Sequence, residues 1–323
     1  MFSKQIISKN LDNCLDDTSF LSIPGRKKGK VRDSYDLGDK ILLITTDRQS
    51  AFDRVLASIP FKGQVLNQVS AFWFENTRHI VKNHVLSIPD PNVTVATKCT
   101  VFPIEFVMRG YLTGSTDTSA WTLYSKGKRS ICGNKLPDGM VKNQKFDSPI
   151  LTPTTKSDAH DESISAEEIV SRGIIDEKTW KKLEAIAFGL FNYGTEVAAK
   201  NGLILVDTKY ELGVDADGEI MLIDEIHTPD SSRYWVKNTY AERFASCKEP
   251  ENIDKEFLRL WFRDHCDPYN DKVLPEAPAD LVTELSSRYI QLYEMITGKQ
   301  FEIDTSIDIK DRMKKNLSDA GII

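Results

Sequence analysis

The sequence predicts an α+β fold, because strand and helix patterns are segregated along its 323 residues. Strand patterns dominate the first third, helical patterns dominate after residue 233, and a hairpin pattern lies between them. Such an order favours α+β over regular strand–helix alternation. The length suits two or three domains. We place a β-rich domain at 1–115, an α+β domain with the hairpin at 116–245, and a helical segment at 246–323.

Hydrophobic periodicity identifies the individual elements. Apolar runs and period-two alternation predict strands over 40–46, 92–98 and 104–109. Apolar residues spaced three and four apart predict helices over the ranges 67–82, 177–200, 254–265 and 279–297. Ser165 and Glu168 form a capping-box pattern that opens a short helix.

The most informative segment is the predicted hairpin, two apolar runs around Val214-Asp-Ala-Asp-Gly218. A loop centred on Ala216 and Asp217 would place Glu211 opposite Leu222. Side chains alternate between faces, so one face would carry Lys209, Glu211 and Asp224. The other face would pack on the core with Val206, Tyr210, Leu212, Met221 and Ile223. Two carboxylates and a lysine on one face suit a divalent cation and a polyphosphate. A one-residue slip of the pairing would separate them.

Composition and charge exclude several classes of protein. A net charge of -6 gives no electrostatic case for binding nucleic acid or an anionic membrane. No apolar run approaches ~20 residues, so no membrane span is expected. The N-terminal residues show no apolar core of signal-peptide length. The five cysteines are scattered and odd in number, which favours free thiols in a reducing cytoplasm.

Two basic segments precede the hairpin. The loop Gly25-Arg-Lys-Lys-Gly-Lys-Val-Arg-Asp-Ser-Tyr35 offers glycine backbone and cations to phosphate, although it has no P-loop pattern. A solvated basic turn is the alternative. Arg109-Gly-Tyr-Leu-Thr-Gly-Ser115 places arginine at a strand end before a hydroxyl-rich turn, which suits an oxyanion. The alternative there is an ordinary turn.

Two further polar segments surround the hairpin. Lys156-Ser-Asp-Ala-His-Asp-Glu162 has one histidine and no cysteine, so a loop closing over a polar substrate fits better than zinc. A polar surface loop is the alternative. Thr228-Pro-Asp-Ser-Ser-Arg-Tyr-Trp235 predicts a helix start whose free N–H groups face an anion. A helix cap without a ligand is the alternative.

Taken together, these segments resemble the SAICAR synthetase family, in the right order through most of the chain. The resemblance is carried by Gly29–Asp33, by Ser50–Asp53 with Lys62-Gly63 and Asn67, and by two specific signatures, Pro103–Ser115 and the hairpin through Arg233. The Arg109-Gly-Tyr form and the length resemble the single-function, yeast-like branch. The loop 156–162 is shorter than in many relatives of that branch.

The resemblance implies an ATP-dependent ligase that joins L-aspartate to carboxyaminoimidazole ribonucleotide (CAIR) in purine biosynthesis, giving SAICAR, ADP and phosphate. It also implies two domains that clasp ATP, as in ATP-grasp enzymes. The expected partners are these small molecules, with no nucleic acid and no membrane. The sequence does not reveal an oligomeric state.

The resemblance also implies a role for each site residue. Glu211 and Asp224 would hold Mg²⁺, and Lys209 would neutralise the transferring phosphoryl group. The nucleotide would lie near Lys30, Arg32, Lys98 and Glu105. Lys156 and Asp158 would lie on the loop that covers the reacting centre. The ribonucleotide would contact Asp53, Arg109, Ser115, Asp230, Ser232 and Arg233.

Three other functions remain open at this point. A small-molecule or sugar-phosphate kinase would need the same lysine, carboxylates and basic loop, but no amine acceptor. A silent nucleotide-binding regulator would be suggested by loss of a metal carboxylate, whereas Glu211 and Asp224 are both present. A purely structural or scaffolding protein is the third alternative, but such a role would not explain why three separate polar segments occur in one chain.

Overall fold

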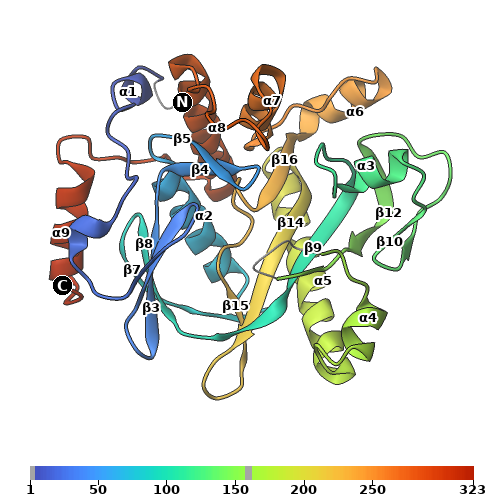
Figure 1. Cartoon of the computed structure of the whole chain (residues 1–323), viewed down its shortest axis with the longest axis horizontal. Coiled ribbons are helices and arrows are strands. Elements are labelled where there is room, and N and C mark those ends of the chain that lie inside the picture. The colour runs from blue at the N-terminus through green and yellow to red at the C-terminus, as the bar shows by residue number, and fades with distance from the viewer. Residues whose placement is uncertain (1–3, 157–161) are drawn as a thin grey trace.

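The computed structural model describes residues 4–156 and 162–323, and two β-sheets organise them (Figure 1). The first sheet has the order β1-β2-β3-β8-β7, with each neighbouring pair antiparallel. The second has the order β12-β9-β14-β15-β6, with β13 added to β9 and β16 added to β14. This mixture of sheets and helices confirms the predicted α+β class.

The strands of the first sheet are β1 (Arg26–Lys28), β2 (Arg32–Asp36), β3 (Lys40–Thr45), β7 (Val85–Asp90) and β8 (Val93–Thr97). Those of the second are β6 (Lys82–Asn83), β9 (Thr100–Leu112), β12 (Gln144–Leu151), β13 (Thr154–Thr155), β14 (Leu203–Val214), β15 (Ile220–Ile223) and β16 (Ser232–Val236). Two small hairpins pair β4 (Arg48–Ala51) with β5 (Arg54–Ser58) and β10 (Ser130–Ile131) with β11 (Asn134–Lys135).

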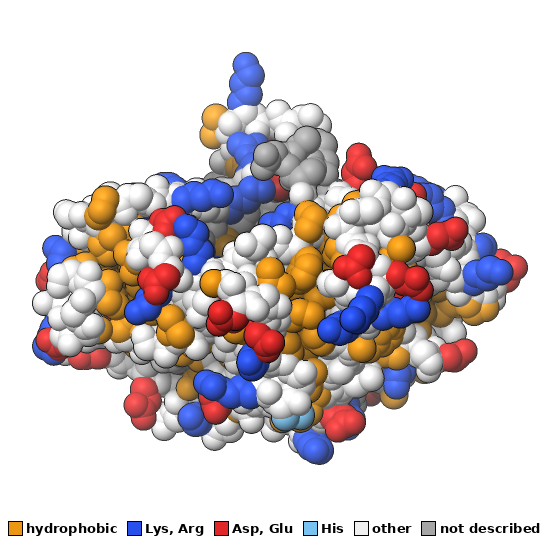
Figure 2. All heavy atoms as spheres, turned by 90° about the horizontal axis from the view of Figure 1, so that it is seen from below, with side chains coloured by type: hydrophobic (Ala, Val, Ile, Leu, Met, Phe, Trp, Pro, Cys, Tyr) orange, Lys and Arg blue, Asp and Glu red, His pale blue; other side chains and the backbone are white. Residues whose placement is uncertain are grey.

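The described helices are α1 (Lys4–Ser8), α2 (Lys62–Asn76), α3 (Ala120–Ser125), α4 (Ala166–Ser171), α5 (Glu177–Lys200), α6 (Lys237–Ala245), α7 (Glu256–His265), α8 (Ala279–Thr297) and α9 (Ile309–Asp319). A 3₁₀ turn covers Ser19–Leu21. None of the described helices is long and apolar enough to cross a membrane. Acidic and basic side chains are interspersed on the face shown in Figure 2.

Two apolar cores hold the sheets. The main core joins α2, α5 and α8 to β9 and β14, with Trp73, Phe106 and Leu190 fully buried. A smaller core lies on the first sheet under α9, where Leu42 and Val93 meet Met313. Burying an aromatic or aliphatic side chain of this size contributes roughly 1.5–3 kcal/mol. Each sheet therefore packs one face on an apolar core, and this packing does not involve the polar residues at its edges.

Several predicted elements are confirmed and some boundaries are corrected. Helices α5 and α8 have their predicted bounds, and the capping box of Ser165 and Glu168 is formed. Helix α2 was predicted at 67–82 but begins at Lys62, after a left-handed Phe61, and ends at Asn76. The predicted domain boundaries at 115 and 245 stay a prediction; β9, just before the first, pairs with β12 and β14.

The predicted helix start at Thr228-Pro229 is wrong, because the chain makes a turn there and then enters β16. The Thr228 hydroxyl accepts from the N–H groups of Asp230 and Ser231, which closes the turn locally. Ser232 then pairs with Thr208 of β14, so the next residues extend the sheet. Pairing with a strand more than twenty residues earlier overrides the local helix signal.

Candidate active site

The hairpin register differs from the predicted one by one residue. Glu211 lies opposite Ile223, not Leu222, because the connection from Val214 to Ile220 holds five residues. Its Gly218 has φ +81°, a conformation that glycine adopts without strain. Leu222 is consequently the β15 residue in the main core, and Ile223 lies on the same side as Glu211. The assignment of Met221 and Ile223 to the core face was therefore wrong.

A bulge in β14 sets which of its side chains share a face. Leu205 lies opposite Tyr234, but Asp207 lies opposite Arg233, so Val206 is the extra residue of β14. A bulge of this kind shifts the side-chain alternation that follows it. Val206 packs in a separate small cluster with Trp235, so its assignment to the main core was also wrong.

Beyond the bulge, one face of β14 carries three charged residues at alternate positions, Asp207, Lys209 and Glu211. Asp207 lies opposite Arg109 of β9, and Glu211 lies opposite Glu105. Like charges directly opposite each other destabilise a sheet unless something neutralises them. Lys209 does so: its ammonium lies 2.6 Å from the Glu105 carboxylate and 2.9 Å from that of Glu211.

Lys156 reaches the same place from the end of β13. Its ammonium pairs with the Glu211 carboxylate. Burial opposes the charge of Lys209, but Glu211, Asp224 and Glu105 together raise its pKa. Lys209 therefore stays protonated at neutral pH, ready to neutralise an anion.

Asp224 joins this group although the predicted register was wrong. It follows β15 with φ +68°, which turns the chain out of strand alternation. Burial would raise the pKa of Asp224, but Arg32, Lys209 and Lys156 lower it. Arg32 lies 2.8 Å from Asp224 and 3.3 Å from Glu225, whose side chain is 12% exposed. We call Arg32, Glu105, Lys156, Lys209, Glu211, Asp224 and Glu225 the charged cluster.

A second group lies further along the same strands, on the side toward α7. Arg233 pairs with Asp207, and the Arg109 guanidinium lies 3.9 Å from the same carboxylate. Arg109 also donates to the Thr152 hydroxyl at 2.8 Å. Burial lowers the pKa of Arg109. Glu256 also lies 3.8 Å from Arg233 and 3.3 Å from Arg259. Two carboxylates thus face three guanidinium groups, which leaves positive charge available for an anion. We call Arg109 and Arg233 the arginine pair.

Beyond the arginine pair, a pocket of about 180 Å³ lies beneath α7. Ser115 donates to Glu256, and Glu256 lies 3.3 Å from Arg259. Arg263 reaches toward the backbone oxygen of Ser115 at 3.4 Å. The pocket is lined by Phe52, Ser115, Thr116, Asp117, Arg259, Leu260, Arg263 and Tyr269. We call it the α7 pocket.

Some predicted site residues lie outside these groups. Lys30 pairs with Asp53 in an exposed contact between two turns. Lys98 pairs with Asp36 at the end of the first sheet, at 2.6 Å. Asp158 lies outside the described residues.

Two predicted substrate-binding residues have internal partners. The Asp230 carboxylate is 5% exposed and lies 2.8 Å from the fully buried Lys62. Burial would raise the pKa of Asp230, but Lys62 holds it at about 2. Ser232 bonds to the Thr208 hydroxyl at 2.8 Å inside the sheet. These contacts position the loop between β15 and β16.

Sequence reasoning did not connect α7 with the site. Lys255, Arg259 and Arg263 are spaced by four residues, which places them on one side of the helix. That spacing was the available signal. Which side of the molecule the helix would face could not be read from it.

The carboxylates of the charged cluster can accept a divalent cation together with phosphate. Within residues 4–156 and 162–323, no three His, Cys, Asp or Glu side chains form a metal-binding group by themselves. Mg²⁺ is usually held by one or two protein carboxylates plus substrate phosphates. Glu211 and Asp224 both lie near Lys209 and are both paired with cations. This donor set therefore fits Mg²⁺ only in company with a nucleotide.

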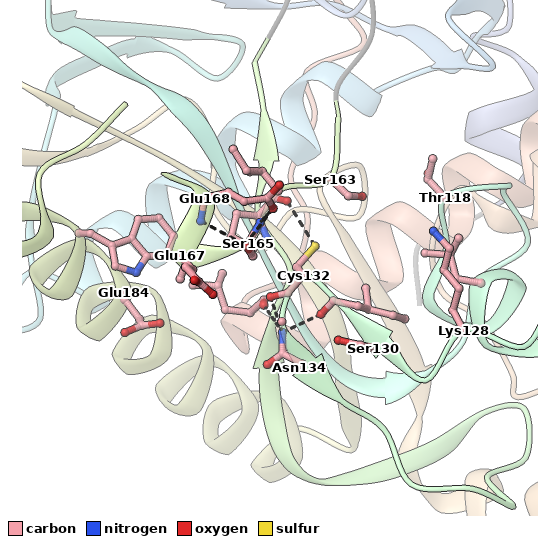
Figure 3. Close-up of a pocket in the computed structure, with 18 of the residues that line it drawn as sticks. Thr118, Lys128, Ser130, Cys132, Asn134, Ser163, Ser165, Glu167, Glu168 and Glu184 are labelled. Carbon is pink, nitrogen blue, oxygen red and sulfur yellow. Dashed lines mark hydrogen bonds between the residues drawn. The ribbon is translucent and has the colours of Figure 1, made fainter. Parts of the chain in front are cut away.

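A separate pocket of about 760 Å³ lies near α4 and α5 (Figure 3). Leu151 and Pro153 line it, whereas Thr152 and Thr154 of the same segment bond to Arg109 and Glu105. Several of its polar groups are already satisfied, since Ser165 bonds to Glu168 in the capping box. The charged cluster and the arginine pair lie on the other side of this segment.

Comparison with known proteins gives consistent matches. The family model described as SAICAR synthetase matches residues 26–276. A phosphoribosylaminoimidazole-succinocarboxamide synthase of Legionella pneumophila (strain Paris) is 60% identical over 305 residues, covering 94% of this chain and 97% of that protein. The SAICAR synthase of Saccharomyces cerevisiae, solved with SAICAR, is 32% identical with a TM-score of 0.74, covering 86% of this chain and 95% of that one. A SAICAR synthetase solved with ADP is 26% identical with a TM-score of 0.66, covering 86% and 100%.

Proposed function

This chain belongs to the SAICAR synthetase family, and we propose that its charged cluster and arginine pair together join L-aspartate to CAIR with hydrolysis of ATP. The observation that carries the proposal is the convergence of Lys209, Glu211 and Asp224. Lys209 and Glu211 lie on the same face of β14 as Asp207, which pairs with the arginine pair from β9 and β16. The charged cluster suits a polyphosphate, and the arginine pair suits an anionic group of a ribonucleotide.

The reaction needs the CAIR carboxylate to be activated, because oxide is a poor leaving group. A carboxylate oxygen attacks the γ-phosphorus of ATP, the bond to the bridging oxygen breaks, and ADP leaves. The resulting acyl phosphate is attacked by the amine of L-aspartate. Phosphate leaves with the electrons of the C–O bond, and the amine loses a proton. Splitting one difficult step into two easier ones is the general advantage of an activated intermediate.

Lys209 and Lys156 are suited to the phosphoryl step. Catalysis of such a step rests on positioning and charge neutralisation. Both ammonium groups pair with Glu211, so they lie where negative charge would develop. Arg32 adds a third cation from the first sheet. Mg²⁺ would be held by Glu211 and Asp224, and when bound it neutralises phosphate charge.

The arginine pair would hold the ribonucleotide. A planar guanidinium binds phosphate through two parallel N–H donors. Arg109 and Arg233 share Asp207, and Glu256 lies 3.8 Å from Arg233 but also pairs with Arg259. Ser115, which lines the α7 pocket, would donate to the ribonucleotide in place of Glu256, on the side away from the charged cluster. CAIR bound in this way would point its imidazole carboxylate toward Lys209.

The test is a coupled assay of ADP release with CAIR, ATP and Mg²⁺, run with and without L-aspartate. We expect sustained release only when L-aspartate is present, with SAICAR formed in equal amount. A stable phosphorylated product formed without L-aspartate would instead support the kinase alternative. Removal of Mg²⁺ with a chelator should stop release, and added Mg²⁺ should restore it.

Three finer assignments belong to the same proposal. The five cysteines are free, which suits a cytoplasmic enzyme. The two sheets would clasp ATP in the manner of ATP-grasp enzymes, with Arg32 and Lys209 supplied from opposite sheets. The chain would divide at residues 115 and 245 into a β-rich domain, an α+β domain with the hairpin, and a helical segment.

A further inference from the structure

Lys255 lies immediately before α7, on a backbone that is fixed on both sides. The Asp254 carboxylate accepts from the Tyr234 N–H at 3.1 Å and from the Glu256 N–H at 2.8 Å. Glu256 in turn accepts from Ser115 at the α7 pocket. These bonds tie the start of α7 to β16 and to the end of β9. The Lys255 backbone is therefore held in place without any contribution from its own side chain.

The Lys255 ammonium is a cation without a counterion of its own. In the part of the chain that the structure describes, its side chain has no ion pair within 4.0 Å and no hydrogen bond. Burial lowers the pKa of the Lys255 ammonium, and the nearby cations Arg259 and Lys62 lower it too. The carboxylates of Asp230 and Glu225 raise it. Lys255 thus lies among two carboxylates and two other cations.

Both neighbouring carboxylates are already engaged elsewhere. Asp230 lies 2.8 Å from Lys62 and accepts from the Tyr289 hydroxyl at 2.7 Å. Glu225 lies 3.3 Å from Arg32 and accepts from Thr228 at 2.8 Å. A partly buried cation without a partner is costly unless a ligand supplies the opposite charge. The position therefore suits an anionic group of a substrate.

The surroundings favour a zwitterion over a phosphate. A phosphate dianion would be repelled by Glu225 and Asp230, the two carboxylates whose charges act on Lys255. An amino acid brings its own ammonium, which can face these carboxylates while its carboxylate faces Lys255. The site also lies beside Asp224, since Glu225 is the next residue in the chain.

We propose that Lys255 binds a carboxylate of L-aspartate, with Arg259 beside it and Glu225 facing the attacking amine. This inference rests on the proposed function and adds the residues that recognise the amine substrate. The nucleotide takes the cations of the charged cluster, and CAIR takes the arginine pair. Lys255, together with Arg259, which Glu256 shares with Arg233, would then be left for L-aspartate.

The test compares Lys255→Met with Lys255→Arg and with the control Lys248→Met, whose side chain is exposed. We expect Lys255→Met to raise KM for L-aspartate roughly ten- to hundredfold, the size of a lost charge-assisted hydrogen bond. KM for CAIR and for ATP should stay within twofold. Lys255→Arg should recover part of the loss, and Lys248→Met should behave as wild type.

A second measurement replaces L-aspartate by hydroxylamine, an amine without a carboxylate. Hydroxylamine attacks the acyl phosphate to give a hydroxamate and phosphate, so it supports ADP release without needing Lys255. We expect Lys255→Met to release ADP at the wild-type rate with hydroxylamine and slowly with L-aspartate. A folding defect would lower both rates together, so the ratio isolates recognition of the carboxylate.

The outcomes separate this inference from the proposed function. If Lys255→Met leaves KM for L-aspartate unchanged, or raises KM for all three substrates equally, Lys255 does not bind L-aspartate. If wild type itself releases no ADP with CAIR, ATP and L-aspartate, the proposed function fails. If wild type is active but unresponsive to hydroxylamine, the acyl phosphate is wrong, and the KM comparison still decides the role of Lys255.

Discussion

The two faces of β14 differ in nearly every physical respect, although they alternate along one strand. On one face, Asp207, Lys209 and Glu211 are each paired with charged groups from other elements. On the other, Tyr210 and Leu212 are fully buried in the main core. The Tyr210 hydroxyl lies 2.5 Å from the ring of His227, which is also fully buried.

This difference shows how one strand can be both anchor and site. The apolar face fixes the strand, so the charged face does not need its ion pairs for folding. Glu105 and Glu211 are buried, but their partners Lys156 and Lys209 are 43% and 31% exposed. Ion pairs that reach solvent in this way contribute only about 0–1 kcal/mol each. The charged face can therefore exchange its internal partners for substrate, while the core stays unchanged. Substitutions on the two faces should separate activity from stability.

The largest expected effect is on the charged face. Glu211→Gln keeps the shape of the side chain but removes the charge that pairs with Lys156 and Lys209. We expect turnover to fall about a thousandfold, equivalent to ~4 kcal/mol, with Tm within a few degrees of wild type. The measurement is steady-state ADP release at saturating Mg²⁺, alongside a thermal melt.

The matched control is Glu219→Gln on the hairpin loop, where the carboxylate pairs with Lys82 and is 58% exposed. It should leave both turnover and Tm unchanged. Wild-type turnover by Glu211→Gln would remove the metal and phosphoryl roles assigned to Glu211. A large loss of Tm would instead show that the charged face is needed for folding.

The core face should behave in the opposite way. Leu212→Ala removes a fully buried side chain from the main core. We expect the free energy of unfolding to fall by about 2–5 kcal/mol, measured by denaturant titration. The specific activity of the folded fraction should stay within twofold of wild type. An unchanged stability with lost activity would reverse the assignment of the two faces.

The sequence was most reliable where a pattern is local. Helix α5 was predicted from residue 177 to 200, since its periodic apolar face is followed by Asn201-Gly202 as a stop signal. The hairpin itself was predicted, but its register was not. Loop length decides register, and the loop between Val214 and Ile220 holds five residues, with Gly218 at φ +81°.

The site was predicted less completely, because convergence depends on distant parts of the chain. Lys209, Glu211 and Asp224 lie close together, but Asp224 does so through its positive φ and not through strand alternation. Asp230 resembled a ligand-binding residue in sequence, yet its partner is Lys62, 168 residues earlier. No local pattern reveals such a partner.

A smaller effect should follow from changing the arginine pair. Arg109→Lys replaces a planar fork, which donates to Thr152 at 2.8 Å, by a single point charge. We expect KM for CAIR to rise about tenfold or somewhat more, with KM for ATP unchanged. Arg78→Lys, at an exposed pair with Glu75, is the control. An unchanged KM for CAIR would remove Arg109 from ribonucleotide binding.

The last expected effect is a pH dependence of stability and concerns His227, which the core face buries against Tyr210. Burial lowers the pKa of His227 to about 3, whereas the unfolded chain titrates near 6.5. Below pH 6.5 the His227 ring is protonated in the unfolded state but stays neutral in the folded state. Its contribution to the free energy of unfolding is therefore full above pH 6.5 and is lost as the pH decreases toward 3. We expect His227 to account for a loss of about 1.4 kcal/mol per pH unit in this window. His227→Asn cannot titrate, and asparagine tolerates the φ of +53° at this position. Denaturant unfolding at pH 7, 6 and 5 should therefore show the wild-type advantage over this variant shrinking with acidity, and parallel curves would show that the buried ring does not couple the core face to pH.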